Sequence, residues 1–211
     1  MVSGMVNERH TALRARIVEI ATRILEAEGL QALQARRIAS EAGCAIGTLY
    51  NVYGGLDDVI IAANTVTLER LGEKLNDARV DTAGHDIEAT LNRFALAYLD
   101  FATEHRLAWR TLFEHQMENA KPVPDTYREK QAQLFAIVES TMRDDVSDPG
   151  RATMVSRALF SAVHGIVALA LDEKLGAYNA DATREQIAFV VGAGARAIRQ
   201  GFTAGETGAA D

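Results

Sequence analysis

Residues 37–50 read Arg-Ile-Ala-Ser-Glu-Ala-Gly-Cys-Ala-Ile-Gly-Thr-Leu-Tyr, and this stretch decides the fold. Ile38, Ala39 and Ala42 fall on one face of a short helix, and Ala39 is small enough for a second helix to cross closely. Gly43 follows, and glycine adopts the positive φ of a tight turn without steric cost. The stretch therefore predicts two short helices joined by a tight turn.

The two short helices have the anatomy of a helix-turn-helix. We expect the first over residues 36–41 and the second over residues 47–53, where Leu49 packs back onto the first. The outer face of such a second helix fits the major groove of DNA. Two short helices around a glycine also occur often in proteins that bind no DNA, so the motif needs support from the rest of the chain.

Apolar residues recur at helical spacing through most of the remaining sequence. A first helix ends before Gly29, a longer one follows the Gly54-Gly55 pair, and the last two long helices are expected over 149–171 and 183–202. The chain has three prolines in 211 residues and few alternating apolar and polar runs. The sequence therefore predicts an all-α protein.

Charge is unevenly distributed along the chain. The net charge is −7, but residues 1–53 carry six arginines against five acidic residues. DNA binding depends on the field within a Debye length of about 8 to 10 Å, so a mildly basic head on an acidic body is compatible with DNA. The charge pattern permits DNA binding without proving it.

The N-terminal motif resembles the DNA-binding domain of the TetR family of transcriptional regulators. The likeness covers about residues 12–60. Its landmarks at the family's spacing are Ala21, Gly29, Ile38-Ala39, Ala42-Gly43 and Thr48-Leu49-Tyr50 followed by Tyr53. Further along, Val163-His164-Gly165 is similar to the WHG type of effector-binding domain in this family. The resemblance implies a repressor that binds a palindromic operator as a homodimer and is released by a small effector.

The resemblance also implies how the chain divides into domains. Residues 10–55 are expected to form a three-helix TetR-type helix-turn-helix domain that binds DNA. Residues 56–202 are expected to form a larger helical bundle for effector binding and dimerisation. The small and polar residues 203–211 are expected to be a disordered tail.

Two departures from the family pattern bear on DNA affinity. The family usually has a lysine two residues after Gly54, where this chain has Leu56, so one phosphate contact is expected to be missing. Gln34 and Ala45 stand where a serine or threonine usually caps the motif helices, and each lost cap costs about 1 kcal/mol of helix stability.

DNA contacts are expected from the start of the first motif helix and from the outer face of the second. Arginines at such places reach a guanine edge or a phosphate, although a solvated surface pair is the alternative interpretation. Tyr53 is expected to pack in the core. The predicted DNA-binding residues are Arg36, Arg37, Ala45, Ile46, Thr48, Tyr50 and Asn51.

Large aromatic side chains in the C-terminal domain suit a pocket for a small, mostly apolar effector. Aromatic residues at helical spacing are more often plain core, and this alternative stays open. The predicted effector-binding residues are Phe94, Tyr98, Phe101, Trp109, Phe113, Met117, Tyr127, Phe135 and His164.

The last two long helices predict a homodimer with a four-helix interface. The helix expected over 149–171 is apolar nearly all round, so a partner subunit has to cover part of it. The predicted interface residues are Phe160, His164, Val167, Phe189, Ala193 and Ala197.

The sequence shows no motif that points to an enzyme or a cofactor. It has no His-Glu-x-x-His or Glu-x-x-His pair, no phosphate-binding glycine loop and no nucleophile elbow. We therefore expect no catalytic residue, no metal and no cofactor. An all-α enzyme and an interaction module without DNA binding remain the alternatives. The absence of a secretory signal and of a long uncharged apolar run predicts a cytoplasmic protein that does not bind membranes.

Overall fold

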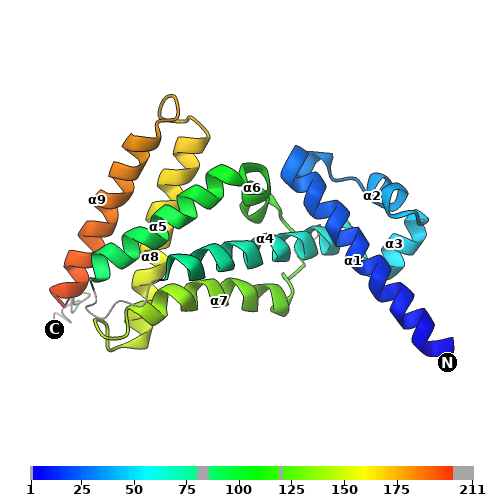
Figure 1. Ribbon diagram of the computed structural model, residues 1–211, viewed down its shortest axis with the longest axis horizontal. Coiled ribbons are helices and arrows are strands. Elements are labelled where there is room, and N and C mark those ends of the chain that lie inside the picture. Colours follow the sequence, from blue (N-terminus) through cyan, green and yellow to red (C-terminus); the bar gives the residue numbers. More distant parts are fainter. Residues whose placement is uncertain (1, 80–85, 119–120, 202–211) are drawn as a thin grey trace, which may run out of the picture. The chain divides into compact units, whose positions relative to one another are not determined.

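The computed structural model describes residues 2–79, 86–118 and 121–201 (Figure 1). Within these ranges the chain forms nine α-helices, one short 3-10 helix and no strand, so the all-α prediction is confirmed. Two compact units divide the chain: Met1–Glu73 with Phe101–Ala132, and Lys74–Asp100 with Gln133–Asp211. The predicted domain boundary after residue 55 falls inside the first unit and stays a prediction. The tail predicted over 203–211 lies outside the described residues.

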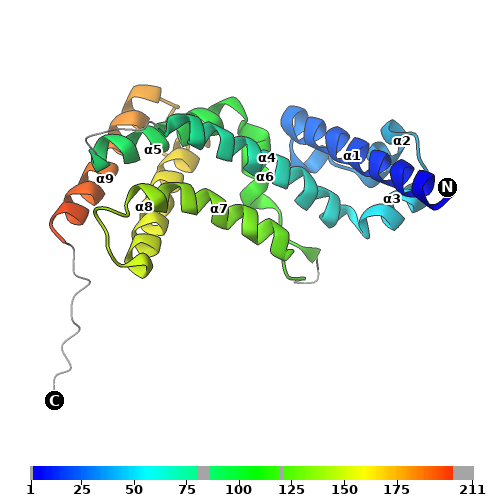
Figure 2. The same cartoon turned by 60° about the horizontal axis from the view of Figure 1, so that its bottom comes forward.

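The first unit begins with the predicted helix-turn-helix. It contains α1 (Val2–Glu28), the 3-10 helix η1 (Leu30–Ala32), α2 (Ala35–Ala42) and α3 (Ile46–Tyr53), followed by the start of α4 (Leu56–Ala78). Helices α2 and α3 both pack on α1, which crosses them (Figures 1 and 2). A shared apolar core holds these helices together, and its fully buried members include Ile17, Ile24, Ile38, Leu49 and Val59.

The turn between α2 and α3 has the predicted geometry. Gly43 is in the left-handed region with φ 70° and ψ 34°, where a side chain would be strained. Its N–H donates to the Ser40 carbonyl at 3.2 Å, and the Cys44 N–H donates to the Ala39 carbonyl at 3.0 Å. These two bonds satisfy carbonyls at the end of α2 and fix the direction in which α3 leaves.

The first unit is completed by α6 (Arg106–Glu114) and by the start of α7 (Asp125–Thr141). Helix α6 packs on α1, and its residues Ala108, Trp109 and Thr111 are buried. The ion pair between Lys130 and Glu69, with 2.8 Å between Nζ and Oε1, joins α7 to α4 within this unit.

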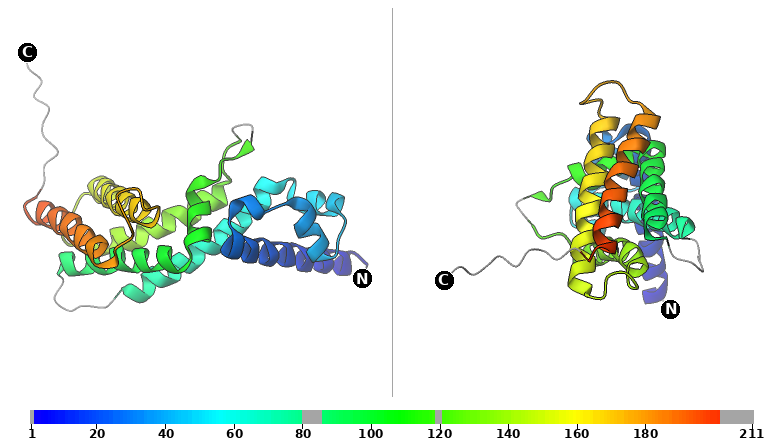
Figure 3. Two further views of the ribbon diagram at one scale, coloured as in Figure 1. Left: turned by 90° about the horizontal axis from the view of Figure 1, so that it is seen from above. Right: turned by 90° about the vertical axis from the view of Figure 1, so that its left-hand side faces the viewer.

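The second unit contains α8 (Pro149–Leu171) and α9 (Ala180–Arg199), which lie side by side, together with most of α5 (Ile87–Glu104) (Figures 1 and 3). Helix α8 has its predicted bounds because Asp148 caps it, accepting from the N–H groups of Gly150 and Arg151. Helix α9 starts three residues earlier than predicted, because the Asn179 side chain caps it by accepting from Ala182.

A glycine brings α8 and α9 close together. A Cβ atom on Gly194 would lie 2.6 Å from Cδ2 of Leu159, which is closer than two carbon atoms approach without a shift. Gly194 of α9 thus lets α8 approach closely within the subunit. On α8, Val163, Val167 and Leu171 are buried, whereas Met154 and Leu169 are each 42% exposed.

Candidate nucleic-acid interface and effector site

Helix α3 has one buried and one exposed face. Leu49, Val52 and Tyr53 are buried in the core of the first unit. Ile46 and Tyr50 are 38% and 42% exposed, and Asn51 is exposed beside Tyr50. The prediction that Tyr53 packs in the core is therefore confirmed, and three of the predicted DNA-binding residues share the open face of α3.

The two remaining predicted residues at the start of α3 are less prominent. Ala45 is the exposed N-terminal cap residue and makes no side-chain hydrogen bond, and Thr48 is half-buried. At the start of α2, Gln34 also makes no capping bond. Both helices of the motif thus begin without a side-chain cap, as the sequence predicted.

The C-terminal end of α3 is clamped to α1 by Arg14 and Tyr53. The Arg14 guanidinium donates from Nη1 to the Val52 carbonyl at 2.8 Å and lies 4.2 Å from the centre of the Tyr53 ring. The Tyr53 hydroxyl donates to the Arg14 carbonyl at 3.0 Å. Burial raises the pKa of this phenol, which keeps it a hydrogen-bond donor at neutral pH.

The C-terminal end of α2 is held by Glu41. Its backbone carbonyl accepts a hydrogen bond from Arg16 at 3.1 Å, and its carboxylate forms ion pairs with Arg23 and Arg37. Since Arg16 and Arg23 belong to α1, Glu41 ties the two helices together through both its backbone and its side chain. Sequence reasoning missed this role, because charge alone does not show which arginines meet Glu41.

Arg36 and Arg37 have different surroundings, although they are neighbours. Arg37 donates to both carboxylate oxygens of Glu28, at 2.6 and 2.9 Å, and from Nε to Glu41 at 3.1 Å. The bidentate bond to Arg37 lowers the pKa of Glu28. Arg36 is exposed and pairs with no group in the described parts of the chain. Arg36 is thus open to DNA, whereas a DNA contact by Arg37 stays a prediction that competes with these internal bonds.

The first turn of α4 is acidic and is fastened to the segment after α6. Asp57 accepts from the Glu118 backbone N–H at 2.8 Å, and its second oxygen lies 3.5 Å from Nε2 of His115. Burial lowers the pKa of His115, against the opposing effect of Asp57 and Glu118. Leu56 opens this turn in place of the family's lysine, so no cation lies between Gly54 and Asp57.

In the second unit, three of the predicted effector-binding residues come together. The Tyr98 hydroxyl and Nδ1 of His164 are 2.8 Å apart in a hydrogen bond. Phe160 stacks on His164 with 5.6 Å between ring centres, and Phe135 meets Phe160 edge-on at 5.3 Å. Burial lowers the pKa of His164, so the imidazole is neutral at pH 7. This group of four residues is called the aromatic cluster below.

Of the other predicted effector-binding residues, one lies in the second unit and five lie in the first unit. Phe94, in the second unit, is 4% exposed. In the first unit, Trp109 contacts Phe113 with 5.6 Å between ring centres. Phe101 and Tyr127 are buried and Met117 is half-buried, all in the first unit. Burial raises the pKa of Tyr127 to about 12.

Comparison with known proteins assigns the C-terminal part of the chain. Residues 91–193 match the model of the tetracyclin repressor-like C-terminal domain. Residues 91–193 belong to this family. No curated protein matches the chain in sequence. The recognition of a TetR-family protein from the N-terminal motif is thus confirmed by the other end of the chain, while the WHG type stays a prediction.

Solved structures with the TetR fold resemble the whole chain. A TetR-family transcriptional regulator from Streptomyces coelicolor is 18% identical with a TM-score of 0.62, over 90% of this chain and 85% of that one. A TetR variant from Acinetobacter baumannii AYE in complex with minocycline is 14% identical with a TM-score of 0.63. The match covers 89% of this chain and 97% of that one. A protein from Rhodococcus sp. RHA1 is 23% identical with a TM-score of 0.66, over 90% and 94%. These likenesses establish the TetR fold.

The predicted interface residues of this TetR-fold chain differ in exposure. Phe189 is 74% exposed, Ala193 is exposed and Ala197 is half-buried, so all three are available on α9. Val167 is 0% exposed within its own subunit, and its place at the dimer interface stays a prediction. Phe160 and His164 are half-buried in the aromatic cluster.

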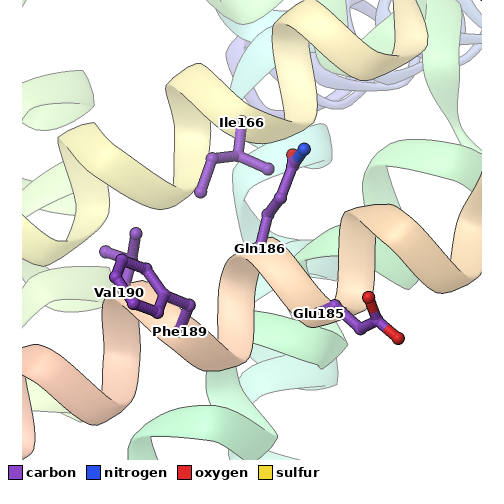
Figure 4. A pocket seen from close by; sticks show the side chains of 5 residues that line it. All are labelled: Ile166, Glu185, Gln186, Phe189 and Val190. Atoms are coloured by element: carbon purple, nitrogen blue, oxygen red, sulfur yellow. The ribbon is translucent and has the colours of Figure 1, made fainter.

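A shallow groove lies beside Phe189 and is lined by residues of α8 and α9. It has a volume of about 370 Å³ and is lined by Ile166, Glu185, Gln186, Phe189 and Val190 (Figure 4). Phe189 and Val190 lie close together on α9 and Ile166 faces them from α8 (Figure 4). Among the residues that the structure describes, no cluster of three metal-binding side chains occurs.

Proposed function

We propose that the protein is a TetR-family transcriptional regulator that binds a palindromic operator as a homodimer and is released from it by a small, mostly apolar effector. The open face of α3 supports DNA binding, since Ile46, Tyr50 and Asn51 are exposed on a short helix that α1 and α2 hold rigidly. A protein with this role acts in the cytoplasm, where the bacterial chromosome lies.

A gel shift with the intergenic DNA beside the protein's own gene tests this proposal. We expect specific binding of the wild type and loss of binding when Tyr50 and Asn51 are both replaced by alanine, because both side chains are exposed on α3. A folded wild type that binds neither this DNA nor a random genomic operator library would instead be an interaction module.

The exposed faces of α8 and α9 support the dimer. Only 22% of the most apolar 18-residue stretch of α8 is buried within the subunit, although its mean hydropathy and length suffice for a membrane span. Met154 and Leu169 on α8 and Phe189 on α9 are large apolar side chains left open to water. A second copy of the same pair of helices would cover them in a two-fold four-helix interface.

The aromatic cluster supports an effector site in the second unit. Tyr98 and His164 provide one polar pair among aromatic rings, which is the mixture typical of small-molecule sites. The effector changes operator affinity only through its different affinity for two conformations, with a coupling of typically about 1 to 3 kcal/mol.

A ligand panel tests the effector site. Aromatic and heterocyclic compounds are screened by thermal shift, and hits are then tested for release of the operator. We expect Tyr98→Phe to weaken binding of a hit while operator binding stays unchanged. Equal loss of both properties would show that Tyr98 is structural.

A further inference from the structure

Most of the arginines in the first 53 residues bind other groups of the protein. Arg14 holds the end of α3, and Arg16, Arg23 and Arg37 bind Glu41 or Glu28. Arg9 and Arg36 are the two that pair with no group in the described parts of this segment, and both are exposed. The segment contains no lysine, and α3 contains no charged residue at all.

This distribution leaves residues 1–53 with few cations for the DNA backbone. Phosphate contacts supply most of the non-specific affinity for DNA and a large share of the specific affinity. The first turn of α4 adds Asp57 and Asp58, which repel phosphate, in place of an attractive charge. Arg9 and Arg36 therefore carry most of the positive charge that this region can offer.

Arg9 continues a stripe of arginines along α1. Arg9, Arg16 and Arg23 recur every seven residues, which is two helical turns, so successive members differ by only about 20° around the helix axis. Arg16 and Arg23 bind Glu41 on α2. Arg9 lies on the same face of α1, two turns before Arg16. This part of the face precedes the two arginines that bind Glu41 of α2.

The distance along α1 suits a contact with the groove wall. Arg14 is fixed against the end of α3 through Val52 and Tyr53. Arg9 precedes Arg14 by five residues, a rise of about 7.5 Å along the helix. Five residues also turn the helix by about 140°, so Arg9 leaves α1 on a different side from Arg14, where its long side chain can reach a phosphate beside the major groove, which is about 12 Å wide.

We propose that Arg9 binds the phosphate backbone of the operator, beside the groove that α3 enters. The proposal rests on the operator binding proposed above and adds a contact from the N-terminal part of α1. Arg9 anchors the protein without reading sequence, because a phosphate is the same at every base pair.

The proposal is tested by measuring operator affinity at several salt concentrations by fluorescence anisotropy. The full-length wild type is compared with Arg9→Gln and with the control variant Arg143→Gln. Arg143 is exposed in the second unit, and its replacement by glutamine removes the same charge as Arg9→Gln. For Arg9→Gln we expect the slope of log K against log salt to shrink by about two per dimer, with an affinity loss on the order of tenfold near 0.15 M salt. Arg143→Gln leaves the slope unchanged, and Arg9→Lys restores it.

Three results would overturn the contact. An unchanged slope for Arg9→Gln, or an equal change for Arg143→Gln, shows that Arg9 touches no phosphate. A loss on the operator without loss on random DNA shows that Arg9 reads a base. If the wild type binds no DNA at all, the proposed function itself fails. If the wild type binds DNA and Arg9→Gln binds it equally well, only the proposed Arg9 contact fails.

Discussion

The Tyr53 hydroxyl donates a hydrogen bond to the backbone carbonyl of Arg14, and the Arg14 side chain in turn covers the Tyr53 ring and bonds the Val52 carbonyl. The contact joins residues 39 positions apart and locks the last turn of α3 onto α1. Helix α3 is thus positioned by a cation, a ring and two hydrogen bonds at its end, in addition to Leu49 and Val52 in the core.

Tyr53→Phe keeps the ring under Arg14 and removes only the hydroxyl. We expect the free energy of unfolding to fall by about 0.5 to 1.5 kcal/mol, the net value of one hydrogen bond. Tyr53→Ala also removes the buried ring, so a larger loss of about 3 to 5 kcal/mol follows. Urea unfolding followed by circular dichroism measures both, and equal losses would mean that the ring contributes nothing.

Phe189→Glu tests the dimer through a large apolar side chain of α9 that is 74% exposed. A charge at this position has to be desolvated if a partner subunit covers it, so we expect a monomer at micromolar concentration. Sedimentation velocity measures the change. Leu175→Glu is the matched control, because Leu175 is 80% exposed but lies in the loop after α8. A Phe189→Glu protein that stays dimeric would place the interface elsewhere.

The parts of the fold that depend on local sequence were predictable. Gly43 and the apolar spacing around it predicted the turn, and the predicted start of α8 at Pro149 is the observed one. The missing caps at Gln34 and Ala45 were also visible, because capping involves residues within one turn. The exposed face of α3 followed from the helical period alone.

The contacts between distant residues were not predictable. Tyr98 and His164 are 66 positions apart, and only folding shows that these two polar groups meet among many aromatic candidates. Arg37 was predicted to bind DNA, and its ion pairs with Glu28 and Glu41 could not be foreseen because they depend on how α1 crosses α2. Val167 was assigned to the interface because α8 is apolar all round, so the sequence did not show which side faces its own subunit.

Acidification is expected to lower stability because burial lowers the pKa of His164 and His115. Between the lowered folded pKa and the unfolded pKa near 6.5, the unfolded state binds more protons, so unfolding becomes easier as the pH falls. We expect a lower Tm at pH 5.5 than at pH 7.5 at fixed protein concentration. His164→Asn keeps an acceptor for Tyr98 and removes one titrating group, so the drop in Tm becomes smaller. An equal drop in this variant would assign the effect to other groups.

Arg36→Ala and Arg37→Ala separate DNA reading from structural support. If Arg36 makes a bidentate bond to a base edge, Arg36→Ala costs about 1 to 3 kcal/mol on the preferred operator and relaxes preference at one position per half-site. Its Tm stays unchanged, because Arg36 has no partner in the described chain. Arg37→Ala lowers the Tm, because Glu28 and Glu41 lose their shared cation. The opposite pattern would exchange the two roles.

Leu56→Lys restores the charge that the family usually carries at the start of helix four. Leu56 begins α4 two residues after Gly54, directly after the end of α3. If this turn lies against the DNA backbone, the added lysine strengthens binding on all sequences alike and steepens the salt dependence by about one unit per contact, or about two per dimer. Asp57 and Asp58 reduce this gain, so Asp58→Asn together with Leu56→Lys is expected to exceed the single variant.

The controls for Leu56→Lys follow from its position at the helix start. A lysine near the positive end of a helix is slightly unfavourable, so the Tm has to be measured beside the affinity. Leu56→Gln removes the apolar side chain without adding a charge, and we expect it to leave the salt slope unchanged. If Leu56→Lys is folded and has the wild-type slope, the start of α4 does not lie on the backbone, and the way in which the family docks on DNA does not hold for this protein.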